Sequence, residues 1–152
     1  MTVLIVDDEA NIRSSLEGAL GREGYQVDCA ASVAEGRAKL REAYDIVLLD
    51  VWFEEGSGLD LLAEIMANTP DSIVIMMSGH ATVDAAVRAT RLGAFDFLEK
   101  PISLERLLVL LRNATNTLAL NGGRVNSAEK GWPCISISSA FTPPMLPWLL
   151  PP

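Results

Sequence analysis

Short apolar runs alternate with longer segments of helical period along the first 120 residues. Such alternation is typical of βα units that build a parallel sheet. The first, third and fourth runs are almost wholly apolar, as expected where helices cover both faces of a sheet. The second run is mixed, which predicts an edge strand. The five runs are Val3–Val6, Gln26–Ala30, Ile46–Leu49, Ile73–Met77 and Phe95–Leu98.

Apolar residues at helical spacing follow each run and predict five helices. Glycines, prolines and a capping serine suggest where these helices begin and end. The predicted helices contain Ile12–Leu20 with Gly21 and Gly24 as terminators, Val33–Leu40, Leu59–Met66, Val83–Leu92 closed by Gly93, and the segment after Ser103. The pattern predicts an α/β, flavodoxin-like doubly wound fold with a five-stranded parallel sheet of order 2-1-3-4-5.

Composition adds a boundary to this picture. The chain has 152 residues, of which 49% are hydrophobic and 21% charged, enough for one ordinary folded domain. Residues 121–152 hold six of the eight prolines and only three charged residues, Arg124, Glu129 and Lys130. We therefore expect a domain over residues 1–120 and an atypical, proline-rich apolar tail over 121–152 that is disordered or derived from another reading frame.

The net charge of −8 makes a nonspecific grip on nucleic acid by this domain improbable. The longest apolar stretches fall far short of the roughly 18 residues needed to cross a bilayer. Two cysteines, Cys29 and Cys134, are too few for a disulfide framework, and the first residues do not resemble a secretory signal. These features predict a cytoplasmic protein without membrane contact.

Three carboxylates follow two strands that this topology makes neighbours. Asp7 and Asp8 come after the first strand, and Asp50 follows the third. Because such a cluster repels itself unless a hard cation neutralises it, the carboxylates predict an Mg²⁺ site. The alternative is that Asp7 to Glu9 merely cap the first helix, whose N-terminus favours negative charge. That alternative leaves Asp50, which ends an apolar run, unexplained.

Two further polar residues end the next strands. Ser78 follows the fourth strand and Lys100 the fifth. A carboxylate nucleophile, a metal, a hydroxyl and an ammonium are what phosphoryl transfer to Asp50 requires, because that reaction depends mostly on positioning and charge neutralisation. A lysine is usually a solvated surface residue. Pro101 argues against that reading, because a residue before proline is held extended.

The segments VLIVDDE, LLD with Gly58 eight residues later, MMSGHA and GAFDFLEKP together resemble the receiver domain of two-component response regulators. The GHAT and GAFDFLEKP segments further resemble NtrC-type activators, and DVWFEEGSGLDLL the NtrX branch. The resemblance implies that Asp50 is the phosphoacceptor, and that Asp7, Asp8, Asp50 and the backbone carbonyl of Trp52 hold Mg²⁺. It implies that Ser78 and Phe97 are the switch residues and Lys100 the phosphate-binding lysine.

By the same resemblance, a sensor histidine kinase donates the phosphoryl group, and the domain itself catalyses transfer and later hydrolysis without being an enzyme in its own right. Ser78 then moves toward the phosphoryl group and Phe97 fills the vacated space. These movements alter the surface of the fourth helix, fifth strand and fifth helix, which is also a possible homodimer face. Ala85, Ala86 and Ala89 leave the fourth helix thinly packed, as suits a movable element. In full-length relatives the output is transcription regulation.

The chain departs from the family pattern at Phe53-Glu54, where many members have Met-Pro, so we expect a differently shaped, less rigid loop with a solvated Glu54. Trp52 is expected to shield the acyl phosphate or line the entrance of the site.

His80 is expected to orient its loop through a hydrogen bond rather than to take part in chemistry. Cys29 is expected to be a small buried hydrophobe.

Other functions remain open at this stage. An aspartyl-nucleophile, Mg²⁺-dependent phosphatase resembles the chain at VLLD but needs an acid where Trp52 stands. A nucleotide or flavin binder needs a glycine- or hydroxyl-rich loop after the first strand, where this chain has VDDEAN. A stand-alone adaptor or a degenerate receiver differs only in output. No GxxxxGK[ST] phosphate loop occurs, so we expect truncation after the receiver.

Overall fold

A computed structural model describes residues 1–80 and 82–120. Five strands form one parallel sheet of order β2-β1-β3-β6-β7. The strands are β1 (Thr2–Val6), β2 (Gln26–Ala30), β3 (Ile46–Asp50), β6 (Ile73–Ser78) and β7 (Asp96–Glu99). The predicted order 2-1-3-4-5 and the edge position of the second strand are confirmed, since the labels β4 and β5 belong to a separate short hairpin.

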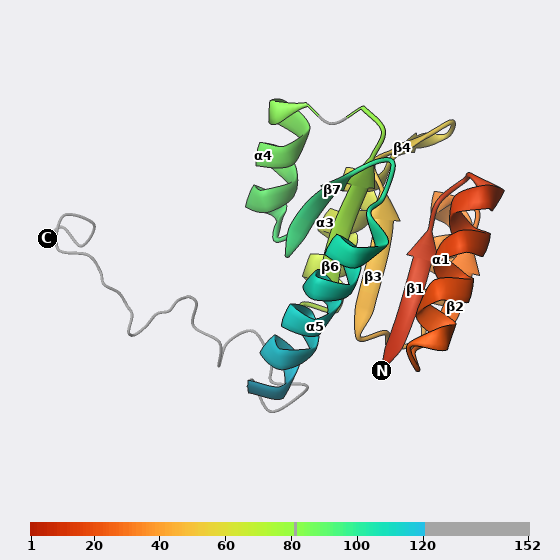
Figure 1. Cartoon of the computed structure of the whole chain (residues 1–152). Coiled ribbons are helices and arrows are strands. Elements are labelled where there is room, and N and C mark those ends of the chain that lie inside the picture. The colour runs from red at the N-terminus through yellow and green to blue at the C-terminus, as the bar shows by residue number, and fades with distance from the viewer. Residues whose placement is uncertain (81, 121–152) are drawn as a thin grey trace, which may run out of the picture. The chain divides into compact units, whose positions relative to one another are not determined.

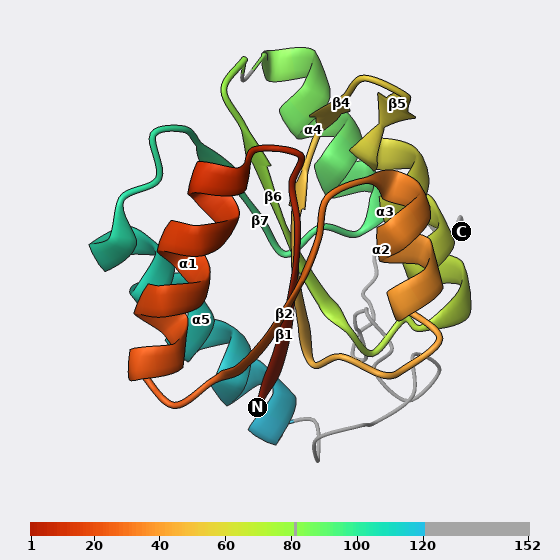
Figure 2. The ribbon, with the colours of Figure 1, turned by 90° about the vertical axis from the view of Figure 1, so that its right-hand side faces the viewer.

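Five helices cover both faces of the sheet, as predicted. Helices α1 and α5 lie on one face and α2, α3 and α4 on the other (Figures 1 and 2). Among the described residues, none of these helices combines the length and apolar character needed to cross a membrane. The helices are α1 (Ala10–Arg22), α2 (Val33–Lys39), α3 (Gly58–Asn68), α4 (Val83–Leu92) and α5 (Leu104–Leu120).

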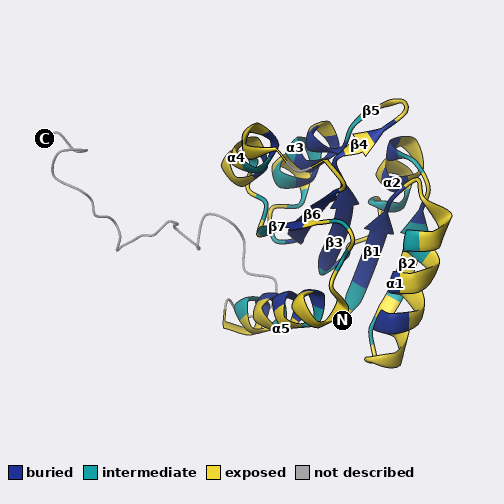
Figure 3. Ribbon diagram, turned by 45° about the horizontal axis from the view of Figure 1, so that its top comes forward, coloured by how far each residue is buried: buried dark blue, intermediate teal, exposed yellow. Residues whose placement is uncertain are grey.

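The central strands are buried along their length, which explains their apolar sequences (Figure 3). Every residue of β3 and β6 is buried, whereas the edge strands β2 and β7 are mixed. Burial on both faces excludes water from the sheet and supplies most of the apolar area removed from solvent on folding. The polar ends of β1, β3 and β6 therefore lie at the rim of a rigid core.

The capping residues act as their types predict. Thr82 caps α4 through its side chain, which accepts a hydrogen bond from the backbone N–H of Ala85 at 3.1 Å. Gly93 ends α4 in the left-handed conformation, with φ of 110°. Ser103 accepts a hydrogen bond from the backbone N–H of Arg106 at 3.3 Å at the start of α5. Helix α4 buries only Ala85 and Ala89, so the thin packing predicted for it is confirmed.

Two local expectations were wrong, and one short element was not predicted. Gly21 lies inside α1, which continues to Arg22, and the left-handed residue beyond that helix is Gly24, with φ of 95°. Cys29 is only half-buried, because it lies on an edge strand, which has a neighbouring strand on one side only. The segment after β3 is a short antiparallel hairpin, β4 (Trp52–Phe53) paired with β5 (Gly56–Ser57), which no apolar run could announce.

Met1–Thr115 form one compact unit of the chain. The predicted domain end near residue 120 stays a prediction. The tail over 121–152 and the expectations made for it lie outside the described residues, as does Cys134.

Candidate functional site

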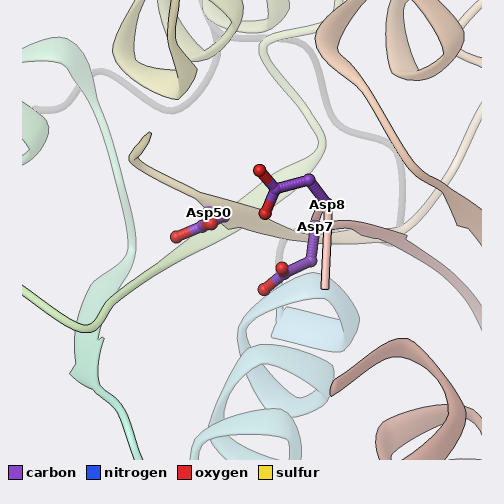
Figure 4. A group of neighbouring side chains, drawn as sticks. All are labelled: Asp7, Asp8 and Asp50. Atoms are coloured by element: carbon purple, nitrogen blue, oxygen red, sulfur yellow. The ribbon is translucent and has the colours of Figure 1, made fainter. Parts of the chain in front are cut away.

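The three predicted carboxylates lie together at the carboxyl ends of β1 and β3 (Figure 4). Asp7, Asp8 and Asp50 each offer an oxygen, and these atoms all lie within 4.8 Å of one another. Asp7 and Asp50 are buried, whereas Asp8 is exposed. Because β1 and β3 are adjacent and parallel, the strand ends bring residues more than 40 positions apart into one cluster.

A cleft of about 520 Å³ opens beside this cluster. Asp8, Asp50 and Lys100 line it with polar groups, and residues of the neighbouring loops complete its wall. The other lining residues are Glu9, Ile12, Trp52, Gly79, His80 and Pro101. The cleft therefore joins the ends of four strands at one solvent-accessible point.

The turn after β1 is shaped by Asp7 rather than by capping of α1. Oδ1 of Asp7 accepts a hydrogen bond from the backbone N–H of Glu9 at 2.8 Å. Its backbone carbonyl accepts one from the guanidinium of Arg13 at 2.7 Å. Glu9 is the N-cap residue of α1 but makes no side-chain capping bond. The structure thus disfavours the view that these acids serve only to cap a helix.

Lys100 reaches into the cluster from the end of β7. Its Nζ lies 2.9 Å from Oδ2 of Asp7, 2.9 Å from Oε1 of Glu9 and 3.3 Å from Oδ2 of Asp50. The side chain is only 11% exposed, so it is not the solvated surface lysine that its residue type would suggest. The peptide bond between Lys100 and Pro101 is cis. One ammonium group thus pairs with three carboxylates.

Burial and mutual repulsion set the charge state of the carboxylates. Burial, with the nearby charge of Asp7, raises the pKa of Asp50 to about 6, although Lys100 opposes the shift. Burial and the charge of Asp7 also raise the pKa of Asp8. Burial alone would lower the pKa of Lys100, but its bonds to Asp7 and Glu9 outweigh that effect and raise it. The negative charge of the carboxylates thus exceeds the single positive charge that Lys100 brings to the cluster.

The donor set fits a hard divalent cation. Oδ2 of Asp7 is buried and accepts no hydrogen bond, although Lys100 forms an ion pair with it. We take that contact as electrostatic attraction without a well-directed bond. Carboxylate oxygens beside an open cleft, which leaves room for water, match the coordination that Mg²⁺ prefers.

Ser78 ends β6 next to the cluster and is fully buried. Its Oγ accepts a hydrogen bond from the backbone N–H of His80 at 3.0 Å. The backbone, and not the imidazole of His80, thus makes the contact that orders this loop, and the exposed side chain of His80 lines the cleft. Phe97 lies on β7 opposite Met76 and is half-buried.

The hairpin β4–β5 covers one side of the site. Trp52 is 49% exposed and lines the cleft, in agreement with a place at its entrance. Glu54 is exposed, as expected, while Phe53 is buried in the core. A side chain at Gly58 would overlap the backbone carbonyl of Asp50, so only glycine permits the chain to return this close to the end of β3.

Two acidic residues with defined partners escaped sequence reasoning. Glu9 bonds to Lys100, and Oε2 of Glu55 accepts a hydrogen bond from the backbone N–H of Val33 at 2.9 Å. Glu9 was visible only as a helix-capping candidate, and nothing in the pattern around Glu55 relates it to a residue 22 positions earlier. Both contacts depend on how loops meet at the sheet edge.

Comparison with known proteins identifies the fold family. The family model of the response regulator receiver domain matches residues 3–112. The chain belongs to this family. It is 44% identical over 112 residues to the response regulator protein PilR of Pseudomonas aeruginosa, covering 73% of this chain and 25% of PilR. The chain thus spans about a quarter of the length of the curated relatives that it matches.

Solved receivers have the same architecture. The receiver domain of NtrX from Brucella abortus is 38% identical, with a TM-score of 0.71 covering 76% of this chain and 98% of that one. The beryllofluoride-activated NtrC4 receiver domain dimer is 44% identical, with a TM-score of 0.71 covering 74% of this chain and 94% of that one. The resemblance to NtrC-type and NtrX receivers is therefore confirmed. Receiver domains are signalling domains rather than classical enzymes.

Proposed function

We propose that Asp50 is the phosphoacceptor of this receiver domain and that a phosphohistidine of a sensor kinase is the donor. A carboxylate oxygen of Asp50 attacks phosphorus, the new P–O bond replaces the P–N bond, and the imidazole leaves and takes up a proton. The observation that carries the proposal is the position of Asp50, 4% exposed and beside an open cleft, with Lys100 3.3 Å away.

Asp7, Asp8, Asp50 and the backbone carbonyl of Trp52 are the groups that we propose to hold Mg²⁺. The ion, when bound, neutralises the carboxylates and the oxygens of the incoming phosphoryl group. The three side chains that converge within 4.8 Å support this assignment, as does the buried Oδ2 of Asp7, whose partner among the described residues is the ammonium of Lys100. The carboxylates orient the site, while the hairpin brings Trp52 to its entrance.

Lys100 and Ser78 complete the proposed acceptor site. The ammonium of Lys100 binds a phosphoryl oxygen, which requires it to loosen its contacts with the carboxylates. The hydroxyl of Ser78, which now accepts from His80, still has its own proton to donate to another oxygen. Its movement frees space for Phe97, and the paired change alters the surface formed by α4, β7 and α5.

That surface is our candidate for self-association. Helix α4 buries only Ala85 and Ala89 fully, with Leu92 partly buried against the core, so a small change in β7 can shift it. Dimerisation is supported by the receiver dimer of NtrC4 and by apolar side chains exposed on these elements. Within Met1–Thr115, the large exposed apolar residues of this region are Val83 and Val87 on α4 and Leu104 and Val109 on α5, with Phe95 directly before β7.

We further propose that the domain ends near residue 120, acts in the cytoplasm and makes no direct contact with nucleic acid, the last because of its acidity. Self-catalysed phosphotransfer and hydrolysis are the only chemistry that we assign to it. A phosphatase role is disfavoured, because Trp52 occupies the position where an aspartyl phosphatase has its general acid.

The test is incubation of the protein with acetyl phosphate, with and without Mg²⁺, followed by intact mass measurement. We expect one phosphoryl adduct that depends on Mg²⁺ and is absent from Asp50→Asn. Folded wild-type protein that forms no adduct with any small phosphodonor would leave a degenerate receiver. An adduct that persists in Asp50→Asn would assign another acceptor.

A further inference from the structure

The side chain of Glu55 joins the hairpin β4–β5 to the start of helix α2. The first backbone N–H groups of a helix have no partner within the helix itself. In α2 the backbone N–H of Glu35 is satisfied from within the same segment, by the side chain of Ser32 at 3.0 Å. The N–H of Val33 instead donates to Oε2 of Glu55 at 2.9 Å. A carboxylate from the phosphorylation-site loop thus completes the start of a neighbouring helix.

The contact joins the exposed tip of the hairpin to a helix start that is packed in the core. Val33 is 8% exposed and belongs to the hydrophobic core, so the start of α2 is firmly placed. The hairpin consists of two short strands and a tip formed by Glu54 and Glu55, both exposed. A charge-assisted hydrogen bond at a helix N-terminus is also stronger than a bond between neutral groups.

We propose that Glu55 is a positioning residue for the Mg²⁺ site, acting through the hairpin on the backbone carbonyl of Trp52. The inference rests on the proposed function, since it assumes that this carbonyl is a ligand. Trp52 lines the cleft beside Asp50, and it pairs with Ser57 across the hairpin whose tip Glu55 anchors. Phe53 keeps the hairpin packed on the core, so loss of the anchor loosens only the tip and, through it, the orientation of the Trp52 carbonyl.

The chain offers a matched control in Glu54. This residue is adjacent, exposed and of equal charge, and within residues 1–80 and 82–120 its side chain makes no hydrogen bond or ion pair. Glu54→Ala removes an equal charge and leaves the bond between Glu55 and Val33 in place. Glu55→Gln keeps an acceptor oxygen but removes the charge. Glu55→Ala removes both.

Three quantities separate the variants: hydrogen exchange of the Val33 amide by NMR, Mg²⁺ affinity by calorimetry, and the rate of adduct formation with acetyl phosphate. Partners outside the ligand set usually contribute 10- to 100-fold to metal affinity, and we expect about a tenfold loss in Glu55→Ala. Its Val33 amide should exchange faster, and its adduct rate should recover at saturating Mg²⁺. Glu55→Gln should lose about threefold or less in affinity, and Glu54→Ala should match the wild type.

Faster exchange at Val33 with wild-type Mg²⁺ affinity in Glu55→Ala would reduce Glu55 to a helix cap and overturn the proposal. An equal loss of affinity in Glu54→Ala would do the same, because charge alone would explain it. If the wild type forms no adduct, the proposed function fails, but exchange and Mg²⁺ affinity still decide the role of Glu55.

Discussion

Glu9 holds the ammonium group of Lys100 at 2.9 Å, although the two residues stand 91 positions apart in the chain. Glu9 is exposed, whereas Lys100 is nearly buried. The ammonium therefore lies between an exposed carboxylate, that of Glu9, and the buried carboxylate of Asp7, which is also 2.9 Å away. On the proposed function, a phosphoryl group on Asp50 would compete with Glu9 for the same donor.

Glu9→Gln should therefore speed phosphoryl uptake. The substitution weakens a competing partner of Lys100 and removes one negative charge that repels an anionic donor. Since Glu9 is 59% exposed, its ion pair is worth no more than about 1 kcal/mol, which corresponds to a gain of about two- to fivefold in rate. Initial rates of adduct formation at saturating Mg²⁺ measure the effect.

Glu17→Gln provides the control for this prediction, because it removes an equal charge from an exposed position of α1 that is not among the carboxylates paired with Lys100. A similar acceleration in both variants would assign the effect to overall charge. A slower reaction in Glu9→Gln would mean that Glu9 positions Lys100 productively instead of competing for it.

Asp50 should make the metal-free protein less stable as pH rises. A carboxyl group whose pKa increases from 3.8 to about 6 on folding favours the folded state only while it is protonated. Its unfavourable contribution therefore begins near pH 4 and is complete above pH 6. At one pKa unit per 1.36 kcal/mol, Asp50→Asn should stabilise the protein by up to about 3 kcal/mol at pH 7.5.

Urea unfolding of the wild type and of Asp50→Asn at pH 4, 5 and 7.5 tests this prediction. The contributions of other titrating groups cancel in the difference between the two free energies of unfolding. The difference should be largest at pH 7.5 and nearly absent at pH 4. Saturating Mg²⁺ should stabilise the wild type more than Asp50→Asn, by mass action on the folded state. A difference that does not change with pH would show that Asp50 titrates normally.

The sequence carries much of this fold because its central strands are buried on both faces. A run such as Ile46–Leu49 has few alternatives to an interior parallel strand, and an acid directly after it is conspicuous. Asp7, Asp50, Ser78 and Lys100 are therefore found by their positions at strand ends, and the structure does bring them to one rim. Which of these strand ends are neighbours follows from the strand order of a doubly wound sheet.

The loops were harder to predict, because their contacts depend on three-dimensional closure. Residues 52–57 contain no periodicity that distinguishes a hairpin from an irregular loop, and the bond between Glu55 and Val33 spans two different βα units. Gly21 does not end α1, although its residue type predicts a helix end. An isolated glycine costs a helix only about 1 kcal/mol, which the packing of Leu16 and Leu20 readily offsets.

Gly58 and Gly21 should respond oppositely to alanine. At Gly58 the new Cβ meets the backbone of Asp50, which cannot rotate away, so Gly58→Ala should destabilise by about 3 kcal/mol and weaken Mg²⁺ binding. At Gly21 nothing lies within 4 Å of the added carbon, so Gly21→Ala should stabilise α1 by about 0.5 kcal/mol. Thermal unfolding and calorimetric titration with Mg²⁺ measure both effects. Equal stability of the two variants would contradict the close approach at Gly58.

Lys100→Met should separate metal binding from phosphoryl transfer. The ammonium now pairs with the same Asp7 and Asp50 carboxylates that we assign to Mg²⁺. Its removal leaves buried negative charge unpaired, so the metal-free variant should lose about 3 kcal/mol of stability while still folding. The vacated carboxylates should bind Mg²⁺ about fivefold more tightly. Adduct formation should nevertheless slow by about 100-fold, because a donor to the transferring phosphoryl group is missing.

Lys39→Met is the matched control for that variant. Lys39 pairs with Glu35 at 3.9 Å on the exposed surface of α2, so the same change of side chain there should leave stability, Mg²⁺ affinity and adduct rate near their wild-type values. The decisive comparison is the sign of the two changes in Lys100→Met. If Mg²⁺ affinity falls together with the rate, Lys100 supports the metal site instead of competing with it. A normal rate would remove Lys100 from the phosphoryl-binding role, since among the described residues no other lysine or arginine forms an ion pair with Asp50.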